Sequence, residues 1–183
     1  FVGYNIFRFD FAYMVRRAQL LDILESFCVL GRMYNYACPL EKRKLSSQQK
    51  GTNEFQFLNI EGRLQFDLLL VLKEDHKWES YALNEVSKRI LNDQKLDLPP
   101  KMIFQRHREG SAGRCEVARY CVQDTLLPVR IMNKLSKLPN AVEMSRVTGV
   151  EITDLLLRGQ QIKVYSQILK FCNAESIIVP TMQ

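Results

Sequence analysis

The N-terminal part of the chain joins a strand-forming run to an amphipathic helix, which limits the chain to folds that combine both elements. Residues 1–6 are rich in strand-forming side chains, and Asp10 heads an expected helix that Gly31 ends. The apolar stripe of that helix comprises Phe11, Met14, Val15, Ala18, Leu21, Leu24 and Cys28. A strand that runs into a helix is typical of α/β proteins, so we expect an α/β fold.

A β-hairpin is predicted further along the chain. Phe55–Ile60 and Arg63–Asp67 are both β-prone, and only Glu61 and Gly62 separate them. Glycine adopts the positive φ that tight hairpin turns require, so Gly62 suits this connection. We therefore expect the two runs to pair with each other.

Helices are expected in the rest of the chain. Ser80 can cap a helix whose buried face comprises Leu83, Val86, Ile90 and Leu91. Gly149 is a natural helix stop, and Thr153 can cap a final helix that runs to Cys172.

A long helix is expected over residues 116–138, with Pro128 inside it. Proline cannot donate a hydrogen bond to the carbonyl four residues back, which here belongs to Asp124. We expect the helix to bend at this turn and to direct Asp124 into a cleft beside Asp10.

The composition is that of a globular domain. Hydrophobic residues make up 46% of the 183 residues, and the longest apolar run, residues 68–72, is too short to span a membrane. The five cysteines are an odd number without a C-x-x-C pair, which favours a reducing, intracellular setting over a disulfide framework. Because the chain begins with Phe1 and has no signal peptide, we expect an excised piece of a longer protein.

The net charge of +6 favours a polyanionic partner. The surplus lies in two stretches, residues 41–50 and 101–119, and we expect both to be loops, the first within an exposed excursion from Cys38 to Asn53. The candidate DNA-binding residues of the first stretch are Lys42, Arg43, Lys44 and Lys50. The alternative is a solvated surface loop with no binding role.

Three residues could serve a metal site. Asp10 stands where the expected strand meets the helix, and Tyr120 and Asp124 are four positions apart on a helix, so they share one face. Each has a structural alternative: Asp10 as a helix cap, Tyr120 as a core aromatic and Asp124 as a surface carboxylate. His76 and His107 have no partner at ligand spacing, so we expect both at the surface.

Two segments resemble motifs of the family B DNA polymerases. Residues 3–10, Gly-Tyr-Asn-Ile-Phe-Arg-Phe-Asp, resemble the second exonuclease motif, and residues 120–124, Tyr-Cys-Val-Gln-Asp, resemble the third, Tyr-x-x-x-Asp. Further blocks agree in order and spacing, and they look most like the delta-type replicative members and their large-DNA-virus relatives: residues 62–67, 80–87, 140–144, 146–150 and 158–164. Several ordered blocks are far more specific than one short motif.

The resemblance implies part of a 3′→5′ proofreading exonuclease of the DEDD type, with an RNase H-like fold in which helices flank a mixed sheet. Asp10 and Asp124 would be ligands in a site for two divalent metal ions, Mg²⁺ or in its place Mn²⁺. Tyr120 would orient the attacking water, and Asn5 would contact the frayed primer end. The family's first motif, Asp-x-Glu, is absent from the sequence, so we expect this fragment alone to be inactive.

The resemblance also implies how the chain divides and what its parent protein binds. Residues 1–150 correspond to the exonuclease domain without its first motif, and residues 151–183 to the start of the polymerase module. The expected partners are primer–template DNA, its single-stranded 3′ end, a processivity clamp and accessory subunits, with no membrane. The expected location is the nucleus or a viral replication site. In the family, a protruding β-hairpin often occupies the region of residues 41–50.

Two alternatives stay open. One is a free-standing DEDD-type nuclease, against which the matching blocks after residue 140 argue. The other is a catalytically inactive exonuclease-like scaffold that binds DNA, against which the joint presence of Asp10, Tyr120 and Asp124 argues.

Overall fold

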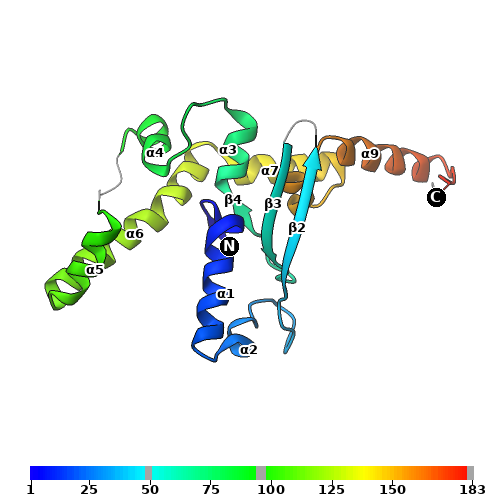
Figure 1. Cartoon of the computed structure of the whole chain (residues 1–183). Coiled ribbons are helices and arrows are strands. Elements are labelled where there is room, and N and C mark those ends of the chain that lie inside the picture. Colours follow the sequence, from blue (N-terminus) through cyan, green and yellow to red (C-terminus); the bar gives the residue numbers. More distant parts are fainter. Residues whose placement is uncertain (48–50, 94–97, 181–183) are drawn as a thin grey trace.

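The structure is a computed structural model that describes residues 1–47, 51–93 and 98–180. Its elements, in chain order, are β1 (Val2–Gly3), the π-helical turn η1 (Ile6–Asp10), α1 (Phe11–Leu20), α2 (Leu24–Phe27), β2 (Leu40–Ser47), β3 (Gly51–Leu58), β4 (Phe66–Asp67), α3 (Leu68–Asp75), α4 (Leu83–Leu91), α5 (Pro100–Arg108), α6 (Ser111–Lys134), α7 (Lys137–Thr148), α8 (Ile152–Leu157) and α9 (Gln161–Ala174). Figure 1 shows the β2–β3 hairpin beside α1 in the middle of the molecule, the α5–α6 arm on one side and α9 extending on the other. The mixture of helices and small sheets confirms the expected α/β class.

The two shortest strands, β1 and β4, pair in parallel, with Gly3 opposite Asp67. The predicted pairing of Phe55–Ile60 with Arg63–Asp67 is therefore wrong. Gly62 does adopt a positive φ of 74°, but the chain beyond it joins the N-terminal strand instead of returning along β3. Parallel partners are distant in sequence, so local turn signals do not reveal them.

The observed hairpin consists of β2 and β3, which are antiparallel and eight residues long each. Leu40 lies opposite Leu58, and Ser47 lies opposite Gly51. The expectation of a loop in the excursion over Cys38–Asn53 is therefore wrong for most of its described part, which forms paired strands, although Lys42 and Lys44 are exposed as expected. A protruding β-hairpin, which the family resemblance implied by position alone, does stand in this region.

The N-terminal helix begins and ends earlier than expected. η1 starts at Ile6 and continues directly into α1, and the strand before it ends at Gly3. Asp22 adopts a φ of 56° after α1, so α2 is a separate short turn. Gly31 does not end a helix but lies against another segment, since a Cβ there would be 3.0 Å from the carbonyl oxygen of Glu61.

The predicted apolar stripe of this helix is only partly buried. Phe11, Val15 and Ala18 are buried, as predicted, whereas Met14 and Leu21 are exposed. Leu21 lies beyond the end of α1 at Leu20, so it is no longer on the helix face that packs on the core.

Phe7 lies at the centre of the first hydrophobic cluster, which joins η1 and α1 to the hairpin. Its ring stacks on Phe57 with centroids 5.2 Å apart and meets the edge of Phe55 at 6.0 Å. The ring of Phe11 is also 6.0 Å from that of Phe7 between centroids. These contacts fix β3 against the helical segment that ends in Asp10.

A second cluster fills the space between α3, α4 and α6. Its buried members are Phe66, Leu68, Leu72, Val86, Ile131 and Met132. The predicted buried face of α4 is confirmed, because Leu83, Ile90 and Leu91 pack against this cluster around Val86. Ser80 precedes the helix cap by two residues, and its hydroxyl oxygen accepts a hydrogen bond from the backbone N–H of Ala82 at 3.3 Å.

Helices replace the loop expected over the basic stretch 101–119. α5 packs against the first half of α6, which begins earlier than the predicted helix over residues 116–138. Gly113 permits this contact, since a Cβ there would lie 2.1 Å from the carbonyl oxygen of Arg106. Ser136 adopts a φ of 49° and separates α6 from α7.

The C-terminal part of the chain is helical but divided. Gly149 ends α7 with a φ of 72°, as predicted. The single helix expected to follow is split at Arg158 and Gly159 into α8 and α9, and Thr153 lies inside α8. In the described part of the chain, no helix combines the length and hydropathy that a bilayer crossing requires.

Candidate functional site

The second-motif turn, Asn5–Asp10, carries the first candidate carboxylate. Asn5 adopts a left-handed backbone conformation, φ 66° and ψ 31°, and its carbonyl oxygen accepts hydrogen bonds from the N–H groups of Arg8 at 3.3 Å and Phe9 at 3.2 Å. Asparagine tolerates this conformation better than most residues. The helical path then continues to Asp10, whose φ of −64° and ψ of −48° are those of a helix interior.

Asp10 therefore lies one turn inside a continuous helical segment, and the prediction that it heads a helix directly after a strand is wrong in detail. It makes no side-chain cap hydrogen bond, so the helix-cap alternative has no support. Its side chain is half-buried. This partial burial raises its pKa above the ordinary value, because the charged form loses contact with water.

Asp67 is a buried carboxylate that the sequence analysis did not single out. Its Oδ1 accepts hydrogen bonds from the backbone N–H of Asn5 at 2.8 Å and of Leu69 at 3.1 Å, and its Oδ2 accepts one from Phe7 at 3.3 Å. A signal was present in the sequence, since this aspartate stands directly before the apolar run that begins at Leu68.

The pKa of Asp67 depends on its burial, its hydrogen bonds and the charge of Asp10. Burial is the main reason why the pKa of Asp67 is raised, while its three backbone hydrogen bonds act in the opposite direction. The negative charge of Asp10 raises the pKa of Asp67 further. A cation near Asp10 would relieve both the lost hydration and the repulsion.

Tyr120 and Asp124 lie on α6 and share one face of it. Positions 113, 120, 124 and 131 recur at helical spacing on one face of α6. Gly113 and Ile131, the first and last of these residues, are buried. Tyr120 and Asp124 are half-buried between them. The prediction of a shared face therefore agrees with the burial pattern of the helix.

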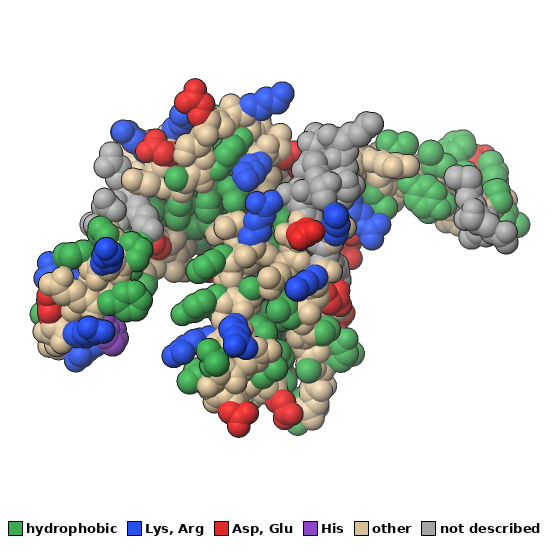
Figure 2. All heavy atoms as spheres, in the orientation of Figure 1, with side chains coloured by type: hydrophobic (Ala, Val, Ile, Leu, Met, Phe, Trp, Pro, Cys, Tyr) green, Lys and Arg blue, Asp and Glu red, His purple; other side chains and the backbone are tan. Residues whose placement is uncertain are grey.

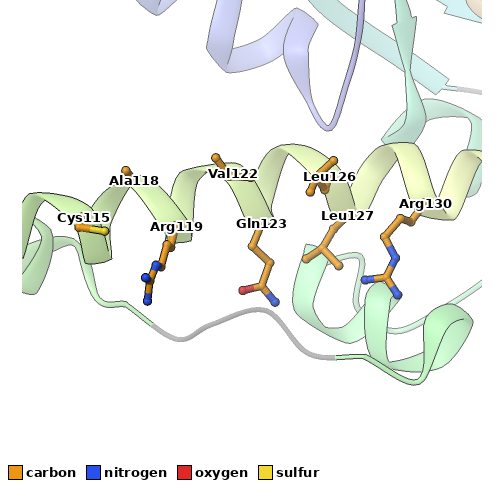
Figure 3. A pocket seen from close by; sticks show the side chains of 8 residues that line it. All are labelled: Cys115, Ala118, Arg119, Val122, Gln123, Leu126, Leu127 and Arg130. Atoms are coloured by element: carbon orange, nitrogen blue, oxygen red, sulfur yellow. The ribbon is translucent and has the colours of Figure 1, made fainter.

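α6 also borders an apolar hollow of about 360 Å³. Figure 3 shows its lining residues, which are Cys115, Ala118, Arg119, Val122, Gln123, Leu126, Leu127 and Arg130. Neither Tyr120 nor Asp124 is among them. The hollow is therefore not the site of the predicted chemistry.

α6 contacts β1, which leads directly into the second-motif turn. Figure 3 shows the N-terminal segment, in blue, passing close to the middle of α6. In Figure 2 the α5–α6 arm stands apart from the lobe that contains α1, with an open gap between them. The helix that carries Tyr120 and Asp124 thus contacts the strand that leads into the segment of Asp10.

The described residues do not assemble a complete metal centre. Across residues 1–47, 51–93 and 98–180, no three His, Cys, Asp or Glu side chains gather closely enough to hold a metal ion. The joint site of Asp10 and Asp124 stays a prediction. Likewise, α6 is continuous through Pro128, and the bend expected there stays a prediction.

The basic residues of the hairpin lie on a regular strand. Lys42 and Lys44 are exposed on β2, and the ammonium of Lys44 lies 4.0 Å from the carboxylate of Glu54 on β3. Arg43 pairs in register with Phe55, but its side chain lies outside the described part. Lys50 lies outside the described residues altogether.

Comparison with known proteins places this architecture in a family. Residues 1–86 match the family model described as DNA polymerase family B, exonuclease domain. The chain is 42% identical over 182 residues to a DNA polymerase delta catalytic subunit from Oryza sativa subsp. japonica, and 43% identical over 179 residues to one from Drosophila melanogaster. A third, from Candida albicans, is 40% identical over 182 residues.

These matches cover 98% to 100% of this chain but only 16% to 17% of each relative. The chain thus spans about one sixth of the length of the curated relatives it matches. The matched region contains the second-motif turn, Asp67, Tyr120 and Asp124 in one continuous similarity. The chain therefore belongs to the family B DNA polymerases, as part of a delta-type catalytic subunit that includes exonuclease-domain sequence.

Proposed function

We propose that this chain supplies part of a 3′→5′ proofreading exonuclease within a replicative DNA-directed DNA polymerase. The observation that carries the proposal is the contact between α6 and β1, which brings the helix of Tyr120 and Asp124 to the strand that leads to Asp10. Similarity to delta catalytic subunits over the whole chain supports the same function and does not favour a free-standing nuclease. An RNase H-like fold for the complete domain is part of the proposal.

In this proposal residues 1–150 are exonuclease domain and residues 151–183 begin the polymerase module. The helix stop at Gly149, with its positive φ of 72°, supports a boundary at that point. Similarity to the delta subunits continues on both sides of it.

Asp10 and Asp124 would hold the divalent metal ions of the proofreading site, Mg²⁺ or in its place Mn²⁺. The donor chemistry fits, because Mg²⁺ prefers a few carboxylates together with water, and a half-buried carboxylate with a raised pKa gains from a nearby cation. Bound metal ions would stabilise the attacking and leaving oxygens of the phosphodiester. In this proposal two of the ligands come from this chain, and the remaining ligands would come from the family's first motif, Asp-x-Glu.

Tyr120 would orient the water that attacks the terminal phosphodiester. It lies one helical turn from Asp124, so its hydroxyl and the carboxylate can act on the same water. Asn5 would contact the frayed single-stranded 3′ end, since its backbone conformation places it at the start of the second-motif turn. Lys42, Arg43, Lys44 and Lys50 would contact DNA phosphates.

The parent protein would act on primer–template DNA with a processivity clamp and accessory subunits, in the nucleus or at a viral replication site. Similarity to delta catalytic subunits supports these partners. The charge of +6 suits a polyanionic substrate.

The test is Asp124→Ala in the full-length protein that contains this sequence. We expect metal-dependent removal of mismatched 3′ ends to fall to background, while nucleotide addition is largely kept, because the lost group is a metal ligand of one site only. Asp75→Ala, at the far end of α3, is the matched control and should leave both activities intact. Equal loss of both activities, or unchanged exonuclease activity in the variant, would sink the assignment. Absence of exonuclease activity from the parent protein itself would support the inactive-scaffold alternative.

Tyr120→Phe sharpens the assignment of roles. It removes a hydroxyl that positions water, so we expect a smaller loss of exonuclease turnover than for Asp124→Ala. Single-turnover digestion of a mismatched primer measures both variants. The reverse order would show that the two roles have been exchanged.

A further inference from the structure

We propose that Asp67 is the positioning residue of the second-motif turn, holding its backbone so that Asp10 is presented in a fixed direction. The inference rests on the proposed exonuclease function. Asp67 lies at the end of β4, 62 positions from Asn5 in sequence.

One carboxylate caps two helices. Oδ1 accepts the N–H of Leu69 and thereby caps α3, for which Asp67 is the N-cap residue. The same oxygen accepts the N–H of Asn5, and Oδ2 accepts the N–H of Phe7 in the first turn of η1. The first N–H groups of a helix have no partner within it, so η1 receives from Asp67 the cap that its own residues do not supply.

The bonds act on the backbone that determines where Asp10 lies. Asn5 is held in its left-handed conformation at the start of the turn, and Phe7 is held one residue into the helix. The helical path from Phe7 to Asp10 has no interruption, so fixing its start fixes the direction of the later side chain. The rings of Phe55 and Phe57 on β3 pack against the Phe7 ring and hold the turn next to the hairpin.

Asp67 acts through the backbone and not as a ligand itself. Its side chain is 3% exposed, and both oxygens already accept N–H groups. A carboxylate is required because three donors converge on two oxygens. An amide in its place would offer one acceptor and would set its own N–H₂ against a backbone donor.

The experiment compares Asp67→Asn with Asp75→Asn in the full-length protein. For Asp67→Asn we expect exonuclease activity to fall roughly 10- to 100-fold and the half-saturating Mg²⁺ concentration to rise, as for the loss of groups that orient metal ligands. Hydrogen exchange should accelerate in the peptide of residues 1–10, while polymerisation stays near the wild-type rate. Asp75→Asn, which removes the charge of a carboxylate paired with Lys137, should change none of these.

Asp67→Ser provides an independent variant if the amide prevents folding. Serine is a good N-cap for α3, but its shorter side chain cannot reach the N–H of Phe7, so the second-motif turn alone loses a bond. We expect the same rise in half-saturating Mg²⁺ with little change in melting temperature.

Two results would overturn the inference. One is unchanged exonuclease activity and Mg²⁺ dependence in a folded variant. The other is a parallel fall in exonuclease activity, polymerisation and melting temperature, which would mean a general structural role. Asp124→Ala in the same assay separates this inference from the proposed function, because an active Asp124→Ala protein would refute the exonuclease assignment whatever Asp67 does.

Discussion

The two halves of the proposed site are held by different means. The second-motif turn is fixed by the contacts around it. The buried carboxylate of Asp67 accepts hydrogen bonds from the backbone of the turn, and the Phe7 ring packs among three other phenylalanines. Tyr120 and Asp124 instead lie on a long helix whose outer face is open, with Val122 58% exposed. The direction of Asp10 is thus a property of tertiary contacts around one turn, whereas Tyr120 and Asp124 move with an entire helix.

The largest effect should come from removing the packed ring of the first half. Phe7→Ala creates a cavity in the first cluster, and we expect the free energy of unfolding to fall by about 3–5 kcal/mol. Val122→Ala, on the open face of α6, is the contrasting change and should alter it by less than about 0.5 kcal/mol. Pulse proteolysis of the exonuclease region measures both, and similar values for the two variants would contradict the comparison.

A second change tests the contact between α5 and α6, the helix that carries Tyr120 and Asp124. Gly113→Ala adds a Cβ 2.1 Å from the carbonyl oxygen of Arg106, and we expect this overpacking to destabilise the α5–α6 contact by about 1–3 kcal/mol. Helix propensity alone would favour alanine by about 1 kcal/mol. A fall in the free energy of unfolding would therefore show that the steric contact outweighs propensity. Ser111→Ala, at an exposed position near the start of α6, is the control. A stabilised Gly113→Ala protein would show that α5 does not lie so close.

A third change tests the electrostatic environment of the first half. The pKa of Asp10 is raised in the folded state, so the native protein binds more protons than the unfolded chain, and stability falls as pH rises from below the ordinary carboxyl pKa through the raised one. Asp10→Asn removes this penalty. We expect a stability gain at neutral pH, below about 1 kcal/mol because the group is partly hydrated, which disappears in strong acid. Melting temperature against pH measures it, and a destabilised variant at neutral pH would be the contrary result.

The smallest effect concerns the β2–β3 hairpin, which packs against the second-motif turn. If Lys42 and Lys44 contact single-stranded phosphates, replacing each by Gln should reduce the log–log salt slope of DNA binding by roughly 0.7. Lys170→Gln on α9 is the control for a charge change elsewhere. An unchanged slope and unchanged transfer of the primer end would establish the alternative of a solvated surface segment.

Local patterns predicted what depends on neighbouring residues. The buried face of α4 around Val86, the stop at Gly149 and the positive φ of Gly62 all follow from spacing or from glycine's backbone freedom. These features need no knowledge of distant partners. The same holds for the shared face of Tyr120 and Asp124 on α6.

Pairing between distant segments was not predictable in this way. Residues 63–67 look like the second arm of a hairpin, yet β4 pairs with β1, 64 positions earlier in the sequence. Lys42 belongs to a polar segment that looks like a loop, but the segment pairs along its length with β3. The role of Asp67 was missed for the same reason, because its hydrogen-bond partners lie far away in sequence.

The parallel pairing of β1 with β4 also sets an order of assembly during synthesis. Asn5 leaves the ribosome 62 residues before Asp67, which at about 5–20 residues per second is an interval of roughly 3–12 s. Throughout that time the second-motif turn has no cap, and Phe7 lacks its hairpin partners for most of it. The turn that presents Asp10 is therefore among the last parts of this region to take shape, although it is among the first to be made.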